Sequence, residues 1–132
     1  MNLIDEAQIG DIYLAYEGTK VRPVLIASDG LGIDIDVNIA RVTSQKQRSE
    51  FDVLLKHWKE AGLTKLSVVR CSKTNFINST NLISKIGELN EDDYNAVFDK
   101  IIEFNIANKE RGKKRYKEVE KVRNQNKPKL TR

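Results

Sequence analysis

GDIYLAYEGTKVRPVLI, residues 10–26, holds two apolar runs separated by a polar, glycine-containing turn. We predict strands over Ile9–Tyr16 and Pro23–Ala27, since apolar runs bounded by glycine and polar residues are typical of strands. Arg22 lies at the start of the second run, directly before Pro23, whose ring restricts the backbone on both sides. A guanidinium held this rigidly suits a phosphate, because its planar fork of donors matches phosphate oxygens.

Residues 33–42 alternate apolar and polar side chains, which is the period of a half-buried strand, and Thr43 follows them directly. The alternation predicts a polar face with Asp34, Asp36, Asn38 and Ala40, and an opposite face with Ile33, Ile35, Val37, Ile39 and Arg41. Further short strands are predicted over Phe51–Leu55, Leu66–Cys71 and Leu82–Leu89, with one helical turn over His57–Ala61 that ends at Gly62.

A helix is predicted after the last strand. Asn90 is a favoured N-cap, and three acidic residues follow it, where the helix dipole favours negative charge. The pattern ends at Ile106. Short strands followed by one amphipathic helix predict an α+β fold, a small β-barrel with the helix packed on it. We place this domain at residues 1–105 and a basic, polar tail, helical or disordered, at residues 106–132. The expected apolar stripe of the helix comprises Tyr94, Val97, Phe98, Ile101 and Ile102.

Composition limits the class of protein. The 132 residues favour one domain, and 39% are apolar, enough for one lean core. No apolar run approaches about 18 residues, so we predict no membrane-spanning helix and no membrane partner. One cysteine, Cys71, cannot form an internal disulfide, and the start of the chain lacks the features of a secretory signal, so we expect a cytoplasmic protein.

The formal net charge of +4 hides a division along the chain. Residues 109–132 contain eleven Lys or Arg and three Glu, a net charge of +8, which leaves −4 for residues 1–108. The body is therefore mildly acidic and the tail strongly basic. A case for nucleic-acid binding by the body rests on individual arginines and lysines. The tail binds RNA phosphates or an acidic partner, or is only solvated.

The sequence predicts no metal site and no cofactor. One His and one Cys cannot form a zinc site with any usual spacing, and no glycine-rich phosphate loop is present. Cys71 ends an apolar run, so a small buried hydrophobe is favoured over a nucleophile that pairs with His57.

Arg22 and Thr43 are the pair with the strongest case for a function. On composition and spacing alone the structural alternative is favoured, in which Arg22 pairs with an acid such as Asp11 and Thr43 is an ordinary strand residue. Arg70 has two interpretations of equal weight. Its side chain points into a cleft on the face opposite Val69, or it packs its stem on the sheet with its head in water.

Three blocks of sequence carry a resemblance. They are residues 10–14 with Arg22-Pro23-Val24-Leu25-Ile26, then Val42-Thr43-Ser44, then residues 67–71 continuing to residues 85–89. In this order and spacing, over about residues 9–105, the chain resembles the MazF/PemK-like toxins of bacterial type II toxin–antitoxin systems. The resemblance implies an SH3-like barrel with a C-terminal helix, of the architecture shared with CcdB-like toxins, and usually a homodimer.

The resemblance also implies an activity. These toxins are mRNA interferases, metal-independent endoribonucleases that cut single-stranded RNA at short sequences. A cognate antitoxin inhibits them by covering the active groove, and the complex binds DNA. By position, the catalytic candidates are Arg22 of the Arg-Pro-Val motif, Thr43, and Arg70 of Val-Val-Arg-Cys. The substrate-binding candidates are Lys20, Ser44, Ser72, Lys73 and Asn75.

The chain departs from the family at two positions. Ser72 stands where the related branch has an aspartate, and Asn75 where it has an arginine. The alternative is a non-catalytic protein of the same fold that binds RNA, an antitoxin or a protein target such as gyrase. Loss of the acid at Ser72 favours a member that only binds RNA or its antitoxin, whereas retention of Arg22 and Thr43 favours the nuclease. For a nuclease, one histidine excludes a two-histidine mechanism within a protomer. The expected reaction is attack of the RNA 2′-hydroxyl on the adjacent phosphorus, with Arg22 and Thr43 as donors.

Overall fold

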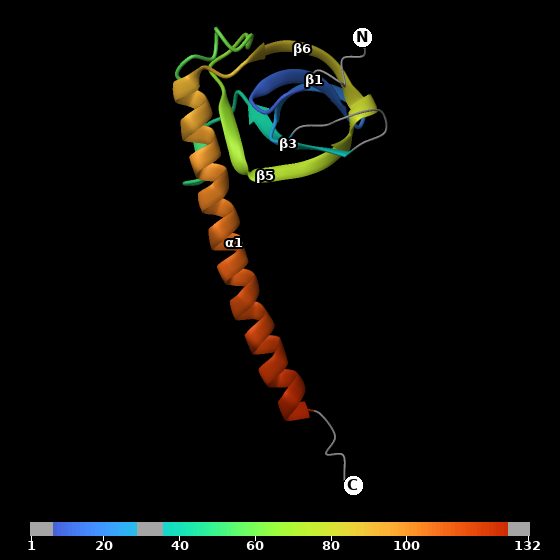
Figure 1. The fold of residues 1–132 in the computed structure, drawn as a ribbon, viewed down its shortest axis with the longest axis vertical. Coiled ribbons are helices and arrows are strands. Elements are labelled where there is room, and N and C mark those ends of the chain that lie inside the picture. The colour runs from blue at the N-terminus through green and yellow to red at the C-terminus, as the bar shows by residue number, and fades with distance from the viewer. Residues whose placement is uncertain (1–6, 29–35, 127–132) are drawn as a thin grey trace.

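The computed structural model describes residues 7–28 and 36–126. In these ranges a single antiparallel sheet has the strand order β4-β5-β3-β2-β1-β6, and one long helix follows it (Figure 1). The strands are β1 (Asp11–Glu17), β2 (Lys20–Ile26), β3 (Asp36–Thr43), β4 (Asp52–Leu54), β5 (Val68–Asn78) and β6 (Leu82–Glu88); a 3₁₀ turn, η2 (Ser79–Asn81), joins the last two, and the helix is α1 (Glu91–Asn126).

The sheet curls strongly, so that β1, β3, β5 and β6 surround a common interior in Figure 1. The edge strands β4 and β6 do not pair with each other in the described sheet, so the barrel is open along one side. The expected α+β fold, a small β-barrel with a C-terminal helix, is confirmed, except that the sheet does not close completely into a barrel.

Successive strand residues point to opposite faces of the sheet, and each face carries its own group of buried side chains. An inner core fills the curl and includes Tyr13, Ala15, Val24, Ile26, Val37 and Ile39. A helix-side core lies between the sheet and α1 and includes Ile12, Leu25, Ala40, Val42, Val69, Cys71 and Val97.

The two cores explain why Ala40 and Arg41 of β3 differ from the faces predicted for them. Ala40 was expected on a polar face, but it is fully buried in the helix-side core. Arg41 was expected among the apolar side chains, but it is exposed, because the inner face opens to solvent at this end of β3. The alternation itself is confirmed from Val37 to Ile39, and the expected positions 33–35 lie outside the described residues.

The first hairpin extends further than predicted. β1 and β2 pair as far as Glu17 opposite Lys20, so β2 begins three residues before the expected start at Pro23. Backbone hydrogen bonds hold this end together without burial, and Arg22 is exposed rather than at the edge of a buried run. β5 is likewise longer than predicted and continues to Asn78.

The helix begins where the sequence places it. The Asn90 side chain accepts a hydrogen bond from the backbone N–H of Asp92 at 2.9 Å, which confirms the N-cap. Val97 and Ile101 are buried as expected, whereas Ile102 is exposed, which corrects that part of the stripe. The helix also continues for 20 residues after Ile106, so the tail is helical as far as Asn126. No described helix is long and apolar enough to cross a bilayer.

Candidate functional site

Arg22 and Thr43 come together because of the register between β2 and β3. Val24 lies opposite Arg41, and each strand runs two residues further to bring Arg22 and Thr43 to the same end of the sheet. All four side chains share the face of the inner core, since they keep its parity along their strands. Arg22 and Thr43 line the same two surface cavities. The sequence-based pairing of these residues therefore agrees with their positions in the structure.

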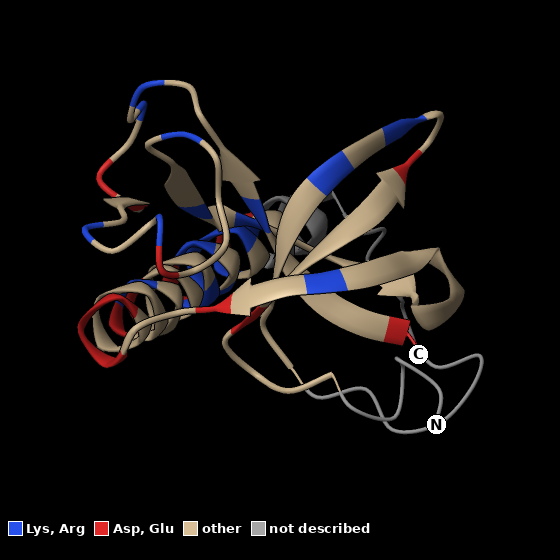
Figure 2. Ribbon diagram, turned by 90° about the horizontal axis from the view of Figure 1, so that it is seen from above, with Lys and Arg blue, Asp and Glu red and all other residues tan. Residues whose placement is uncertain are grey.

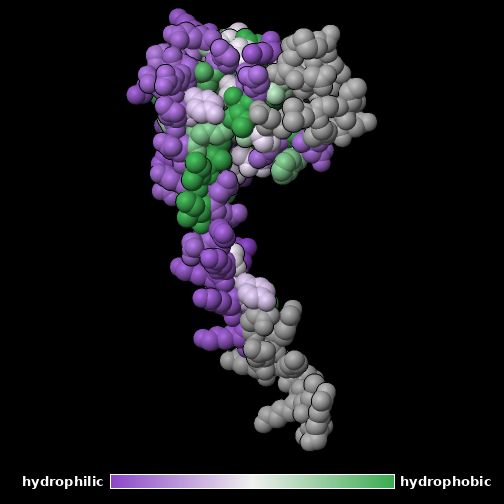
Figure 3. Space-filling view, viewed as in Figure 1, coloured by the Kyte–Doolittle hydropathy of each residue, from purple (hydrophilic) through white to green (hydrophobic). Residues whose placement is uncertain are grey.

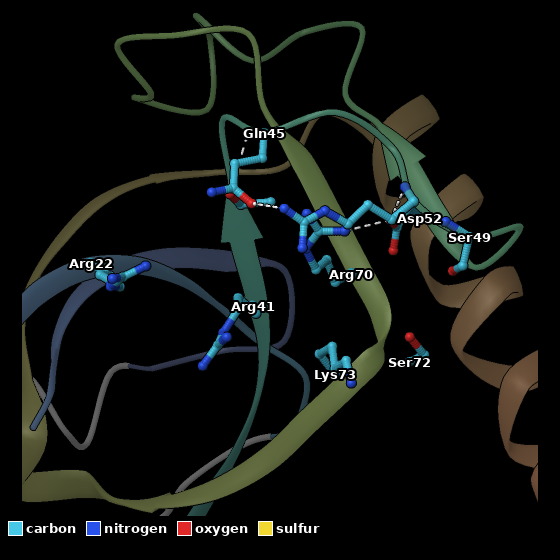
Figure 4. Close-up of a pocket in the computed structure, with 10 residues that line it drawn as sticks. Arg22, Arg41, Gln45, Ser49, Asp52, Arg70, Ser72 and Lys73 are labelled. Carbon is cyan, nitrogen blue, oxygen red and sulfur yellow. Dashed lines mark hydrogen bonds and ion pairs between the residues drawn. The ribbon is translucent and has the colours of Figure 1, made fainter.

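The first cavity has a volume of about 280 Å³ and is strongly cationic (Figure 4). Five cationic side chains line it, and Asp52 is the carboxylate among its lining residues. We call this cavity the cationic pocket. Its lining residues are Arg22, Arg41, Thr43, Gln45, Arg48, Ser49, Asp52, Arg70, Ser72 and Lys73.

Arg70 is held from below by a buried ion pair. Its Nη1 donates to Asp52 Oδ2 at 2.6 Å, and the two side chains are only 9% and 2% exposed. The register places both residues opposite each other across β4 and β5, and Arg41 opposite Arg70 across β3. Of the two interpretations for Arg70, the cleft is therefore correct. The head is not in water, because Asp52 and the carbonyl oxygen of Lys46 accept its hydrogen bonds.

The same carboxylate fixes the loop between β3 and β4. Asp52 Oδ2 accepts hydrogen bonds from the backbone N–H of Arg48 at 2.7 Å and of Ser49 at 3.3 Å. Arg48 in turn donates to the Gln45 side chain at 2.9 Å, drawn as a dashed line in Figure 4. The loop therefore holds the Arg48 guanidinium at the rim of the cationic pocket.

Glu17 is the acid that faces Arg22. Its Oε2 lies 3.7 Å from Arg22 Nε and 3.4 Å from Arg41 Nη2. The structural alternative, an ion pair of Arg22 with an acid, is therefore present, but the acid is Glu17 and not Asp11, the example given for it. Asp11 instead pairs with Lys85 at 3.3 Å and accepts from the backbone N–H of Gln8. The reason is distance along β1, because Asp11 lies at the opposite end of the strand from Glu17, beside Lys85 of β6.

Thr43 is oriented to donate a hydrogen bond. Its Oγ1 accepts from the backbone N–H of Gln45 at 3.2 Å, which leaves the hydroxyl proton for another acceptor. Arg22 and Arg41 have side chains 44% and 49% exposed, so their donors reach solvent at the pocket. Together these groups suit an anion with several oxygens, such as a phosphodiester.

The second cavity lies on the other side of Arg22 and Thr43 and has a volume of about 270 Å³. Its walls combine the apolar side chains of Pro23, Val42 and Leu63 with hydroxyl groups and one lysine. The polar lining residues besides Arg22 and Thr43 are Ser44, Thr64, Lys65 and Ser67.

The remaining sequence candidates fall into two groups. Ser72 and Lys73 line the cationic pocket, and Ser44 lines the second cavity. Lys20, at the tip of the first hairpin, and Asn75, exposed on β5, line neither cavity.

The sequence-based analysis missed five residues of the pocket: Arg41, Gln45, Arg48, Ser49 and Asp52. For Arg41 the sequence contained a signal, because this charged residue stands at a position of the alternating strand where an apolar side chain is expected. The residues of the β3–β4 loop offered none, since they resemble any polar loop. In the described ranges, no three acidic, histidine or cysteine side chains gather closely enough to hold a metal ion.

Comparison with known proteins adds a family to this geometry. The model of the family described as PemK-like, MazF-like toxin of type II toxin–antitoxin system matches residues 8–105. No curated protein matches the chain by sequence.

Solved structures share the fold. A Mycobacterium tuberculosis toxin, MazF-mt6, is 28% identical with a TM-score of 0.55, over 69% of this chain and 91% of that one. An endoribonuclease bound to its cognate antitoxin from a mycobacterial species is 17% identical with a TM-score of 0.61, over 74% and 93%. A MazE–MazF complex from Deinococcus radiodurans is 20% identical with a TM-score of 0.58, over 72% and 90%.

Proposed function

The chain belongs to the PemK-like, MazF-like toxin family of type II toxin–antitoxin systems, and from this premise we propose that it is an endoribonuclease that cleaves single-stranded RNA. The observation that carries the proposal is the cationic pocket, in which Arg22, Thr43 and Arg70 meet although they come from three different strands. Structural relatives with the same fold are endoribonucleases, which supports the assignment.

The proposed reaction needs donors at one phosphodiester. The RNA 2′-hydroxyl attacks the adjacent phosphorus, the bond to the 5′-oxygen breaks, and a cyclic phosphate and a 5′-hydroxyl result. Arg22 binds the phosphate and assists protonation of the leaving oxygen, while Thr43 donates to a non-bridging oxygen. Arg70 adds positive charge from the pocket floor. Preorganised donors of this kind each contribute roughly 10²–10³-fold to the rate.

Asp52 acts through Arg70 in this scheme. Its Oδ2 already accepts three hydrogen bonds, from Arg70, Arg48 and Ser49, so its charge is engaged within the protein. We assign it a positioning role, in which it aims the Arg70 guanidinium and holds the Arg48 loop.

The replacement Arg22→Lys tests the assignment. It keeps the charge but removes the bidentate fork, so we expect kcat to fall by about 100-fold. Cleavage of a fluorescent RNA, with 5′ ends mapped by primer extension, measures the effect, and an unchanged melting temperature shows that the variant folds. Wild-type rates in Arg22→Lys would remove this residue from the mechanism.

A second experiment tests the nucleophile. An RNA with a single 2′-deoxyribose 5′ to the cleavage position should resist the enzyme, while the same RNA with the deoxyribose one nucleotide away should be cut. Cleavage of the first substrate would contradict attack by the 2′-hydroxyl. Both reactions are run with EDTA, because the proposed reaction needs no metal.

We propose a cognate antitoxin as the protein partner, one that covers the pocket, together with a homodimeric toxin and a cytoplasmic location. The structures of relatives bound to antitoxins support the first of these. The single cysteine is consistent with the last.

One observation favours a second function. Ser72 lines the cationic pocket at the position where the related branch has an aspartate, so the site lacks that acid. A binder of RNA without cleavage would retain the five cations and lose only this group. Intact RNA after long incubation, together with tight RNA binding, would favour this alternative over the nuclease.

A further inference from the structure

The C-terminal half of α1 is a separate feature of the surface. Beyond Ala107 the helix leaves the body and projects into solvent (Figure 1). Every described side chain from Asn108 to Lys121 is exposed. We call residues 108–126 the helical extension. The space-filling view shows its described surface as predominantly hydrophilic (Figure 3).

The helical extension is strongly basic and poorly neutralised. It contains eight Lys or Arg and three Glu, a net charge of +5. Among the described side chains of this segment, Lys113 lies within ion-pair distance of a carboxylate, that of Glu110 at 3.9 Å. The other described basic side chains have no such partner among the side chains that the structure describes: Lys109, Arg111, Lys114, Arg115, Lys117 and Lys121.

The extension begins near β4, the edge strand that carries Asp52 of the cationic pocket. Phe104, one turn before it, packs edge-on against Phe51 with ring centroids 5.1 Å apart. Phe51 directly precedes Asp52, which is part of the pocket. Figure 2, seen from above, shows Lys and Arg in blue both on strands of the curled sheet and on α1. Because adjacent strand residues point to opposite faces, Phe51 faces α1 and Asp52 faces the pocket. An RNA strand that leaves the pocket around the edge strand β4 reaches the side of the sheet on which the extension begins.

The shared fold does not require the extension. The family model ends at residue 105, within α1. The three structures described above match 90–93% of their own length but only 69–74% of this chain. A helix without burial on any side is weakly stable by itself, and these residues add nothing to the core.

We propose that the helical extension is a docking surface for the phosphate backbone of single-stranded RNA, independent of sequence, which captures the substrate next to the cationic pocket. This inference rests on the proposed function for the identity of the nucleic acid. Cationic side chains release counterions from the phosphates, which favours binding at low salt.

RNA fits this surface better than a bilayer does. A membrane-surface helix needs an apolar face opposite its basic face. Between residues 108 and 121 the exposed large apolar side chains are Tyr116 and Val119. At about 3.6 residues per turn, the described lysines and arginines of this segment spread over about two-thirds of the helix circumference. The positive charge is therefore available to a polyanion from most sides.

The test measures binding without cleavage. A fluorescent 30-nucleotide RNA with 2′-O-methyl riboses cannot supply the attacking hydroxyl, so its anisotropy reports binding alone. We compare the full-length protein with Lys114→Gln/Lys117→Gln on the extension and with Lys56→Gln/Lys59→Gln on the body, which removes the same charge. Gln has nearly the helix propensity of Lys, and circular dichroism checks that the helix remains.

The extension variant should bind about tenfold more weakly at low salt. Its slope of log K against log salt should be smaller in magnitude by about 1.4, since each lost phosphate contact removes about 0.7 for single strands. The body variant should match the wild type. An unchanged slope in the extension variant, or no binding by the wild type, would overturn the inference.

Three further outcomes separate this inference from others. If the extension variant loses affinity for duplex DNA or for phosphatidylserine vesicles but not for RNA, the partner is wrong. If the slope falls as expected but natural RNA is never cut, the docking surface stands and the nuclease fails. If RNA is cut but the slope does not change, the nuclease stands and the docking surface fails.

Discussion

Asp52 organises the charges of the cationic pocket. It lies 2.6 Å from the Arg70 guanidinium and accepts two backbone N–H groups of the loop that carries Arg48. Both side chains of the pair are almost fully buried, so neither charge has water as a substitute partner. Loss of one partner of such a pair leaves an uncompensated buried charge.

Removal of Asp52 therefore tests the pocket at the level of one residue. We expect Asp52→Asn to lower the free energy of unfolding by about 3 kcal/mol, measured by urea denaturation. Arg70→Gln should cost a similar amount, and the double variant less than the sum of both. Glu17→Gln is the control, since the exposed ion pairs of Glu17 are worth less than about 1 kcal/mol. Equal costs for Asp52→Asn and Glu17→Gln would contradict the buried pair.

Cys71 is a buried thiol that stays protonated. Burial, and to a lesser degree the charge of Asp52, raise the pKa of Cys71 from 9.0 to about 12. Its Sγ lies 3.5 Å from the carbonyl oxygen of Val97, to which the thiol donates. The sequence-based interpretation of Cys71 as a small buried hydrophobe is confirmed.

This raised pKa predicts a loss of stability in alkali. Between pH 9 and pH 11 the folded protein keeps a proton that the unfolded chain has released, so the free energy of unfolding falls as pH rises. The contribution is about 1.4 kcal/mol per pH unit. Cys71→Ala should show a slope shallower by about this amount in urea denaturation at these pH values. An identical slope would mean that the thiol ionises in the folded state.

The turn after β4 and the strand β6 meet at backbone level. Gly62 has a φ of +87°, and a Cβ at this position would overlap the carbonyl oxygen of Ile86. The turn has one helical hydrogen bond, from the N–H of Ala61 to the carbonyl of His57, and it ends at Gly62 as the sequence predicts. Only the folded chain shows that this glycine also permits close approach to β6.

Two glycines with positive φ allow the cost of a left-handed backbone to be measured separately from the cost of the steric overlap with β6. Gly18, in the first hairpin, has a φ of +61° and open space around its missing Cβ. We expect Gly18→Ala to cost about 1 kcal/mol, the conformational term alone. Gly62→Ala should cost at least twice as much, because the turn must also move away from β6. Comparable melting temperatures for the two variants would show that the turn shifts freely.

The molecule consists of a packed body and a helix that extends beyond it. The inner core and the helix-side core hold β1 to β6 and the first turns of α1. From residue 108 onward no described side chain is buried. Local stability follows burial, so the two parts differ in how readily their backbone hydrogen bonds open.

Hydrogen exchange on the full-length protein measures this difference. We expect amides of residues 108–126 to exchange at least about 100-fold faster than those of β1 and β3. The strand amides open only with the cores, whereas the extension frays from its end. Addition of the 2′-O-methyl RNA should slow exchange in the extension. Strong protection of the extension without RNA would show that it packs on another surface, such as a second copy of the chain.

The short-range patterns of the sequence were sufficient for the elements and for part of the site. Apolar runs between polar turns predict the strands, Asn90 predicts the start of α1, and the motifs around Arg22, Thr43 and Arg70 predict residues that the fold brings into one pocket. These signals are local, because backbone conformation and the spacing of apolar side chains depend on neighbours along the chain.

Tertiary structure alone decided which side chains complete the pocket and how far the elements extend. Asp52 and Arg48 enter the site through pairing of β4 with β5 and through a loop folded onto Arg70. Ala40 is buried and Arg41 exposed because the curled sheet covers both faces of β3 and opens at one end. Long-range contacts of this kind depend on residues distant in the chain, and the energy of a buried charge depends on the partner that the fold supplies.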